Sequence, residues 1–159
     1  MAISDHNYNT ARQILVNAVV ATDIADKGLQ EERKDRWTLA FERDTANLSK
    51  EESDRRATIV MDYILQASDV AHTMQHFLTY KKWNQRLFME RYNAYIAGNG
   101  DQNPANDWYQ GEIGFFDFYI IPLTKKLKEC GVFGVSSGEF LNYATKNREI
   151  WELRGEEAV

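Results

Sequence analysis

Apolar residues recur every three or four positions over long stretches of the chain, and strict alternation of apolar and polar residues is rare. This spacing places the apolar side chains on one face of a helix, whereas a strand would need a period of two. The pattern predicts helices over residues 10–26, 29–43, 52–71, 75–97, 108–130 and 136–153. We therefore expect an all-α chain of about six helices.

Short polar motifs predict where several of these helices begin. A serine followed three residues later by a glutamate is typical of a capping box, in which each side chain accepts a hydrogen bond from the other's backbone. Two such pairs occur, Ser49 with Glu52 and Ser136 with Glu139. Residues 97–107 combine glycine, asparagine, aspartate and proline and are predicted to form a loop.

Glycine and proline predict where other helices end or bend. Gly28 follows the first helical segment and indicates its end. Pro122 lies inside the segment 108–130, where its ring removes a backbone donor, so we expect a kink there.

The composition narrows the class of protein. The chain has 159 residues, with 24 acidic against 19 basic side chains and a net charge of −5, which argues against binding a nucleic acid backbone. A single cysteine, Cys130, excludes an intrachain disulfide and favours a reducing compartment, so we expect a cytoplasmic protein. The most apolar stretch, residues 113–123, is shorter than the roughly 20 residues of a membrane span, and no targeting segment is visible.

One acidic residue stands in a segment that is otherwise predicted to be buried. Asp69, followed three residues later by His72, lies near the end of the helix predicted over 52–71. A buried carboxylate is costly unless it is paired. From the residues alone, a solvent-facing position or a salt bridge is a commoner explanation than a metal ion.

Five short motifs, in a particular order, point to a family. They are "ATDIADK" (21–27), "ILQASDVAH" (64–72), "YKKWNQR" (80–86), "EIGFFDFYIIPL" (112–123) and "NREIW" (147–151). In this order they resemble the C-terminal half of the catalytic domain of class I 3′,5′-cyclic nucleotide phosphodiesterases. The resemblance covers essentially the whole chain. It implies one partial domain over residues 1–159, the C-terminal part of a helical HD/PDEase-type catalytic domain.

The resemblance implies hydrolysis of cAMP or cGMP to the 5′-monophosphate by a hydroxide held between Zn²⁺ and Mg²⁺. In the family, two histidines and two aspartates hold the zinc, and the later aspartate corresponds to Asp69. Thr22 and Asp23 correspond to residues that line the metal pocket behind the ligands. His72 corresponds to a residue near the nucleotide.

The resemblance also implies a purine pocket formed by His72, Asn84, Leu87, Glu112 and Phe115. Phe115 and Leu87 correspond to the pair that clamps the base. Glu112 stands where the family has a glutamine that hydrogen-bonds the purine edge. An ionised carboxylate can only accept hydrogen bonds, so the choice between adenine and guanine stays open.

The remaining zinc ligands and the histidine acid of the family precede "ATDIADK". His6, in "HNYNTA", resembles the acid motif, but Thr10 stands where a second histidine is expected. We therefore expect negligible hydrolysis by this chain alone. The missing N-terminal half is the expected partner, and apolar faces left uncovered would promote self-association.

Two other interpretations stay open at this point. The chain could be a catalytically inactive binding or regulatory module on the same scaffold, which Glu112 in place of glutamine slightly favours. It could also be an unrelated helical bundle that resembles the family by chance.

Overall fold

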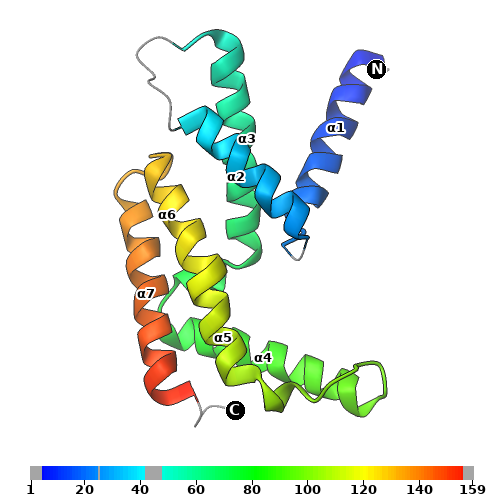
Figure 1. The fold of residues 1–159 in the computed structure, drawn as a ribbon, viewed down its shortest axis with the longest axis vertical. Helices are drawn as coiled ribbons and strands as arrows, with labels where there is room; N and C mark the ends of the chain where they lie inside the picture. The colour runs from blue at the N-terminus through cyan, green and yellow to red at the C-terminus, as the bar shows by residue number, and fades with distance from the viewer. Residues whose placement is uncertain (1–4, 25, 42–47, 156–159) are drawn as a thin grey trace. The chain divides into compact units, whose positions relative to one another are not determined.

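A computed structural model describes residues 5–24, 26–41 and 48–155, and every regular element in these ranges is helical (Figure 1). The all-α prediction is confirmed. The chain divides into two compact units, Met1–Asp69 and Val70–Val159. Among the described residues, no helix is long and apolar enough to cross a membrane. The side chains of residues 5, 6, 10 and 27 are outside the description, so the prediction for His6 is not tested.

Three helices make up the first unit: α1 (Asp5–Ala21), α2 (Lys27–Phe41) and α3 (Lys50–Asp69). α3 packs against both α1 and α2. The buried Trp37 of α2 stacks on Phe41 at 4.2 Å and meets Tyr63 of α3 edge-on at 4.9 Å. Aromatic contacts therefore join α2 to α3.

The structure corrects the prediction for Gly28. This glycine lies inside α2, while α1 already ends at Ala21. The side chain of Asp26 accepts a hydrogen bond from the backbone amide of Leu29 at 3.1 Å, as an N-terminal cap does. Asp26 therefore caps the start of a new helix, and Gly28 lies within that helix and does not end the one before it.

The capping box at the start of α3 is confirmed. The amide of Glu52 donates to Oγ of Ser49 at 3.2 Å, and the amide of Ser49 donates to Oε2 of Glu52 at 2.8 Å. The hydroxyl of Ser49 also donates to that oxygen at 2.7 Å. Because these contacts are local, the motif could be recognised without the tertiary fold.

The second unit contains η1 (Ala71–Met74), α4 (Phe77–Ile96), η2 (Pro104–Asn106), α5 (Trp108–Phe115), the π-helical turn η3 (Phe116–Ile120), α6 (Ile121–Glu129) and α7 (Ser136–Arg154). α7 packs against η1, α4, α5, η3 and α6 (Figure 1). Its buried Asn147 donates to the carbonyls of Thr73 at 2.9 Å and Gln75 at 2.7 Å, which ties η1 to α7. The core includes Tyr80, Phe116, Ile120, Leu127 and Trp151.

A π-helical turn precedes the proline where we expected a kink. α5, η3 and α6 follow one another without a break, so the predicted helix 108–130 is one helical run. The amide of Ile121 donates to the carbonyl of Phe116, five residues earlier. Pro122, which cannot donate, follows at once. The turn buries Phe116 and Ile120 and leaves Phe118 exposed.

The second predicted capping box is wrong. Among the described residues, no side chain caps the start of α7. Gly131 and Gly134 adopt positive φ values of 71° and 53°, which fold the preceding turn tightly. Carbonyls of that turn accept the amides of Ser136 at 3.2 Å and Ser137 at 3.3 Å, so backbone groups take the place of the predicted side-chain cap.

Candidate functional site

Four polar side chains of the second unit form one hydrogen-bonded chain, which we call the Tyr80 network: Trp108, Asn84, Tyr80 and Glu112. Trp108 Nε1 donates to Asn84 Oδ1 at 3.1 Å, and Asn84 Nδ2 donates to the Tyr80 hydroxyl at 3.4 Å. The Tyr80 hydroxyl donates to Glu112 Oε2 at 2.7 Å. Tyr80 and Asn84 lie four residues apart on α4, as do Trp108 and Glu112 on α5, so each pair shares a helix face.

The environment of the network disfavours charge. Burial raises the pKa of Glu112, although hydrogen bonds from Tyr80 and Asn84 and the charge of Arg91 act in the opposite direction. Burial, followed by the neighbouring Glu112 carboxylate, also raises the pKa of Tyr80. The tyrosine therefore acts as a neutral hydrogen-bond donor at physiological pH.

Three of the predicted nucleotide residues meet around Tyr80. Asn84 and Glu112 hydrogen-bond with its hydroxyl. The half-buried ring of His72 on η1 lies 6.5 Å from the Tyr80 ring at an interplanar angle of 5°. His72 also lies 6.3 Å from Trp83. Side chains of η1, α4 and α5 thus lie around one tyrosine, and Glu112, 32 residues away in sequence, is the long-range contact among them.

The predicted clamp residues lie one helical turn further along the same two helices. Leu87 follows Asn84 by three residues on α4 and is partly exposed. Phe115 follows Glu112 by three residues on α5 and is half-buried. Its ring stacks on Tyr119 at 5.4 Å and 21°. Side chains three residues apart project on the same side of a helix.

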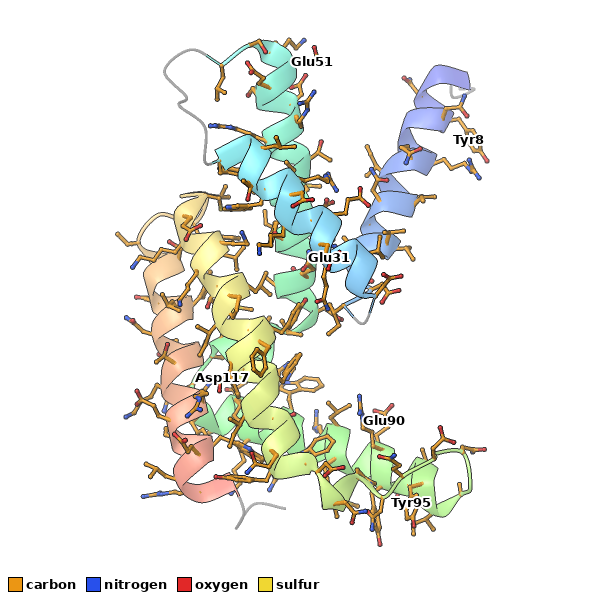
Figure 2. All side chains as sticks on the ribbon, viewed as in Figure 1. Tyr8, Glu31, Glu51, Glu90, Tyr95 and Asp117 are labelled. Atoms are coloured by element: carbon orange, nitrogen blue, oxygen red, sulfur yellow. The ribbon has the colours of Figure 1, made fainter. Side chains whose placement is uncertain are left out.

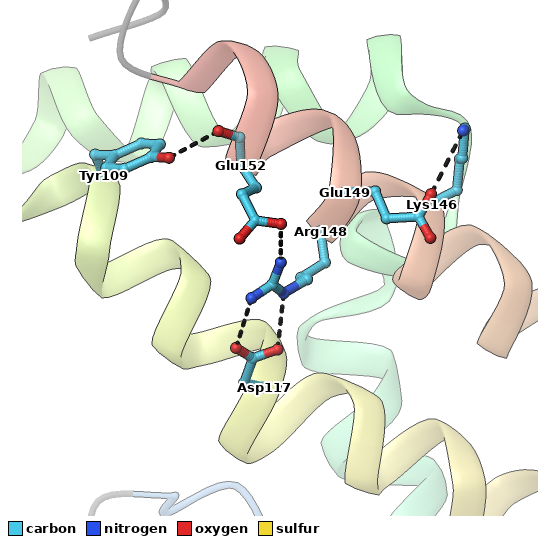
Figure 3. Close-up of polar contacts among 6 residues, drawn as sticks. All are labelled: Tyr109, Asp117, Lys146, Arg148, Glu149 and Glu152. Atoms are coloured by element: carbon cyan, nitrogen blue, oxygen red, sulfur yellow. Dashed lines mark hydrogen bonds and ion pairs between the residues drawn. The ribbon is translucent and has the colours of Figure 1, made fainter.

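A second polar cluster holds α7 against the π-helical turn next to Phe115 (Figure 3). The guanidinium of Arg148 donates to both oxygens of Asp117, at 2.9 and 3.0 Å, and also pairs with Glu152. The hydrogen bond from Arg148 lowers the pKa of Asp117. The Tyr109 hydroxyl donates to the Glu152 carbonyl at 2.7 Å, which joins α5 to the same end of α7. This cluster restrains the segment that carries Phe115.

The predicted metal-pocket residues lie in the first unit. Thr22 and Asp23 are exposed in the turn after α1, where the Thr22 hydroxyl donates to the Val19 carbonyl at 2.9 Å. The Asp23 carbonyl accepts from Nη2 of the buried Arg33 at 3.0 Å. The turn is thereby joined to α2.

Asp69 is the last residue of α3, and its side chain is exposed. Of the explanations that the residues left open, the solvent-facing position is the one observed: α3 ends at Asp69, and the next residue, Val70, is buried instead. The buried acid of α3 is Asp62, which accepts from Arg36 at 3.0 Å. Burial raises the pKa of Asp62, and Arg36 opposes that rise.

The described residues do not fit a complete zinc and magnesium site. Within 5–24, 26–41 and 48–155, no three or more His, Cys, Asp or Glu side chains are grouped so that they could hold a metal ion. Asp69 could supply one ligand, whereas a structural or catalytic zinc takes at least three from the protein. Its role as a ligand stays a prediction.

The comparisons with known proteins define the class to which this chain belongs. Residues 1–132 match the 3'5'-cyclic nucleotide phosphodiesterase family. The chain belongs to this family, and the interpretation as an unrelated bundle is wrong.

A solved structure with a similar fold is the phosphodiesterase domain of the RhoPDE fusion protein from the choanoflagellate Salpingoeca rosetta, with a TM-score of 0.66 and 17% sequence identity. The match covers 98% of this chain and 50% of that chain, so this chain spans about half the length of that structure. No curated protein matches the sequence.

Two members of the Tyr80 network were missing from the predicted site. Tyr80 and Trp108 lie four residues before the predicted Asn84 and Glu112, respectively. A search for polar-tipped aromatic residues one helical turn before each predicted site residue would have found both. That they meet across α4 and α5 depends on the tertiary fold.

Proposed function

We propose that this chain forms part of a cyclic nucleotide phosphodiesterase domain and carries its purine pocket and one metal ligand. The substrate is cAMP, cGMP or both, hydrolysed to the 5′-monophosphate by the complete domain. The observation that supports this proposal is the convergence of His72, Asn84 and Glu112 on Tyr80 in a chain of this family.

Each pocket residue has a role suited to its chemistry. Glu112 hydrogen-bonds the edge of the base, and His72 and Asn84 border the nucleotide. Phe115 offers an aromatic face for stacking, and Leu87 closes on the opposite side of the ring. The cluster around Arg148 supports Phe115 by holding the π-helical turn.

Asp69 is proposed as one ligand of the zinc, with Thr22 and Asp23 behind the metal site. The exposed carboxylate could bind a metal ion whose other ligands come from outside the described residues. A zinc and magnesium pair would supply an activated hydroxide in the complete domain. Because companion ligands are needed, we expect negligible hydrolysis of cAMP or cGMP by this chain alone.

The proposed partner is the remaining part of a phosphodiesterase domain. The solved domain is about twice as long as the region that this chain matches, and its unmatched half corresponds to the proposed partner. α1 presents an exposed apolar surface, on the same helix as Tyr8 (Figure 2), formed by Ile14, Leu15, Val16, Val19 and Val20. An exposed surface of this kind promotes association, either with that part or between copies of this chain.

A binding experiment tests the purine pocket. Calorimetric titration of the purified chain with cAMP and with cGMP should give binding that Phe115→Ala weakens about tenfold or more, since base stacking contributes about 1–3 kcal/mol. Phe118→Ala is the matched control, because Phe118 lies three residues later on the same helical run and is 86% exposed. Equal losses in the two variants, or no binding of either nucleotide, would contradict the proposal.

A turnover assay tests the expectation that the chain alone is inactive. Incubation of the chain with either nucleotide, Mg²⁺ and Zn²⁺ should release no 5′-monophosphate above background. Turnover that Asp69→Ala abolishes and that Asp101→Ala leaves intact would show that the chain holds a working metal centre by itself. Asp101 is an exposed acid of the loop after α4 and serves as the control.

The second candidate function is a catalytically inactive binding or regulatory module. Two observations favour it: Glu112 stands where the family has glutamine, and the described residues do not group three metal-binding side chains. This function predicts nucleotide binding without hydrolysis even when the remaining part of a phosphodiesterase domain is supplied. A turnover assay of the chain joined to such a part, with Mg²⁺ and Zn²⁺, separates the two functions.

A further inference from the structure

The buried side chain of Asn147 on α7 contacts the backbone between η1 and α4. Its Nδ2 atom lies 2.9 Å from the carbonyl oxygen of Thr73 and 2.7 Å from that of Gln75. A carbonyl oxygen can only accept a hydrogen bond, so the atom that faces both of them must be the amide nitrogen. The NH₂ group carries two hydrogens and faces two acceptors, and each hydrogen therefore has one partner.

The two carbonyls belong to backbone that leaves the helical pattern, which we call the Gln75 break. Thr73 lies at the end of η1, and the last carbonyls of a helix lack partners within it. Gln75 is extended, with φ −120° and ψ 178°, and α4 begins only at Phe77. A hydroxyl group donates one hydrogen and an ionised carboxylate donates none, so neither could replace the two hydrogens of the Asn147 amide.

The geometry of the Gln75 break decides where His72 lies. His72 precedes the break on η1, and Tyr80 follows it on α4. Their rings lie 6.5 Å apart and are nearly parallel, at 5°, and the His72 ring is also 6.3 Å from that of Trp83. Because an extended residue separates the two helices, helix geometry alone does not produce this arrangement. A contact that holds the break also holds His72 beside α4.

We propose that Asn147 is a positioning residue whose two amide hydrogens fix the angle between η1 and α4, and thereby hold His72 at the border of the nucleotide pocket. The link to the nucleotide rests on the proposed function. Asn147 is 1% exposed, so water does not compete for the two carbonyls. The helix that supplies it is also held elsewhere, since Trp151 Nε1 donates to the Tyr109 carbonyl at 3.1 Å. That helix lies beyond residues 1–132, which match the family.

A measurement on the wild-type chain tests the contact with both carbonyls. In ¹⁵N-labelled protein, the side-chain NH₂ hydrogens of Asn147 should exchange with water about tenfold more slowly, or slower still, than those of Asn142. Asn142 is an exposed asparagine of the same helix and serves as the internal reference. Exchange at Asn147 as fast as at Asn142 overturns the contact.

A variant tests the positioning role without any ligand. Asn147→Leu removes both donors at similar side-chain volume, and Asn142→Leu is the matched control. In Asn147→Leu the ring proton resonances of His72 should move, because the ring currents of its aromatic neighbours act from a changed distance. The indole N–H resonance of Trp151 should stay in place. Unchanged His72 resonances overturn the positioning role, and so does a displaced Trp151 resonance, which would show that α7 as a whole has moved.

A binding experiment tests the link to the nucleotide. In calorimetric titrations with cAMP and with cGMP, Asn147→Leu and His72→Ala should each weaken binding about threefold or more. Because Asn147 acts through His72, the double variant should lose little more than His72→Ala alone. Phe115→Ala should instead add its full loss to that of Asn147→Leu.

Additive losses for Asn147 and His72 overturn the link between this contact and the nucleotide. If the wild-type chain binds neither nucleotide, the proposed function and this link fail together. The resonances of His72 and Trp151 then still decide whether Asn147 positions η1, so the two failures are distinguishable.

Discussion

The ion pair between Arg148 and Asp117 gives a prediction whose size follows from its geometry. Arg148→Met removes two parallel hydrogen bonds, at 2.9 and 3.0 Å, and the contact with Glu152. The side chains of Arg148 and Asp117 are 22% and 36% exposed, so solvent screens the pair in part. We therefore expect a cost of about 1 kcal/mol, at the upper end for exposed pairs because the geometry is bidentate.

The assay is urea denaturation followed by circular dichroism, together with the thermal midpoint. For a chain of 159 residues, about 1 kcal/mol corresponds to a fall in Tm of about 3 °C. Arg148→Lys should retain only part of the stability, because an ammonium group cannot form the two parallel bonds. Lys146→Met is the control on the same helix, since its pair with Glu149 joins exposed side chains at 3.5 Å.

The pH dependence has a definite sign. Arg148 lowers the pKa of Asp117 below its ordinary 3.8, so the folded state binds this proton less readily than the unfolded state does. The contribution is complete above pH 3.8 and is lost as the pH falls through the lowered pKa. The difference between wild type and Arg148→Met should therefore shrink in acid. A variant as stable as Lys146→Met at neutral pH, or a cost that stays constant in acid, would refute this reasoning.

Three further predictions concern other parts of the chain. Burial raises the pKa of Glu112, so the free energy of unfolding of the wild type should fall as the pH rises from about 4.5 through the raised pKa. Urea titrations should show that Glu112→Gln becomes more stable relative to the wild type over that pH range. Ser49→Ala removes the hydroxyl that caps α3 and should speed amide hydrogen exchange in its first turn; unchanged rates would count against the cap. Val19→Glu, on the exposed apolar surface of α1, should reduce self-association in sedimentation velocity runs, whereas Val135→Glu, at the 92% exposed Val135, should not.

Local interactions explain which parts of the fold could be predicted. The helix positions follow from apolar spacing, and the Ser49 box depends on contacts within four residues. Gly28 does not end the first helix: α1 ends at Ala21, and Asp26 caps a new helix, α2, that contains this glycine. The predicted capping box at Ser136 does not form, because carbonyls of the preceding turn accept the amide hydrogens at the start of α7.

The candidate site divides in the same way. The order of the motifs identified the family from the sequence, and the family match confirmed it. The same motifs suggested Glu112 and Phe115 as pocket residues, and these roles stay predictions. Neither the motifs nor the apolar spacing revealed that Tyr80 is the residue on which the polar groups converge.

The sequence by itself determined the helical class, most of the helix positions and the family, because each depends on residues that are close together along the chain or on the order of short motifs. Only the tertiary structure decided that Asp69 is exposed, that Asp62 is the buried acid of α3, and that Tyr80 links Asn84 to Glu112. Burial and hydrogen bonds between helices depend on which faces pack together. Helical spacing shows which residues share a face, but it does not show which other helix that face will meet.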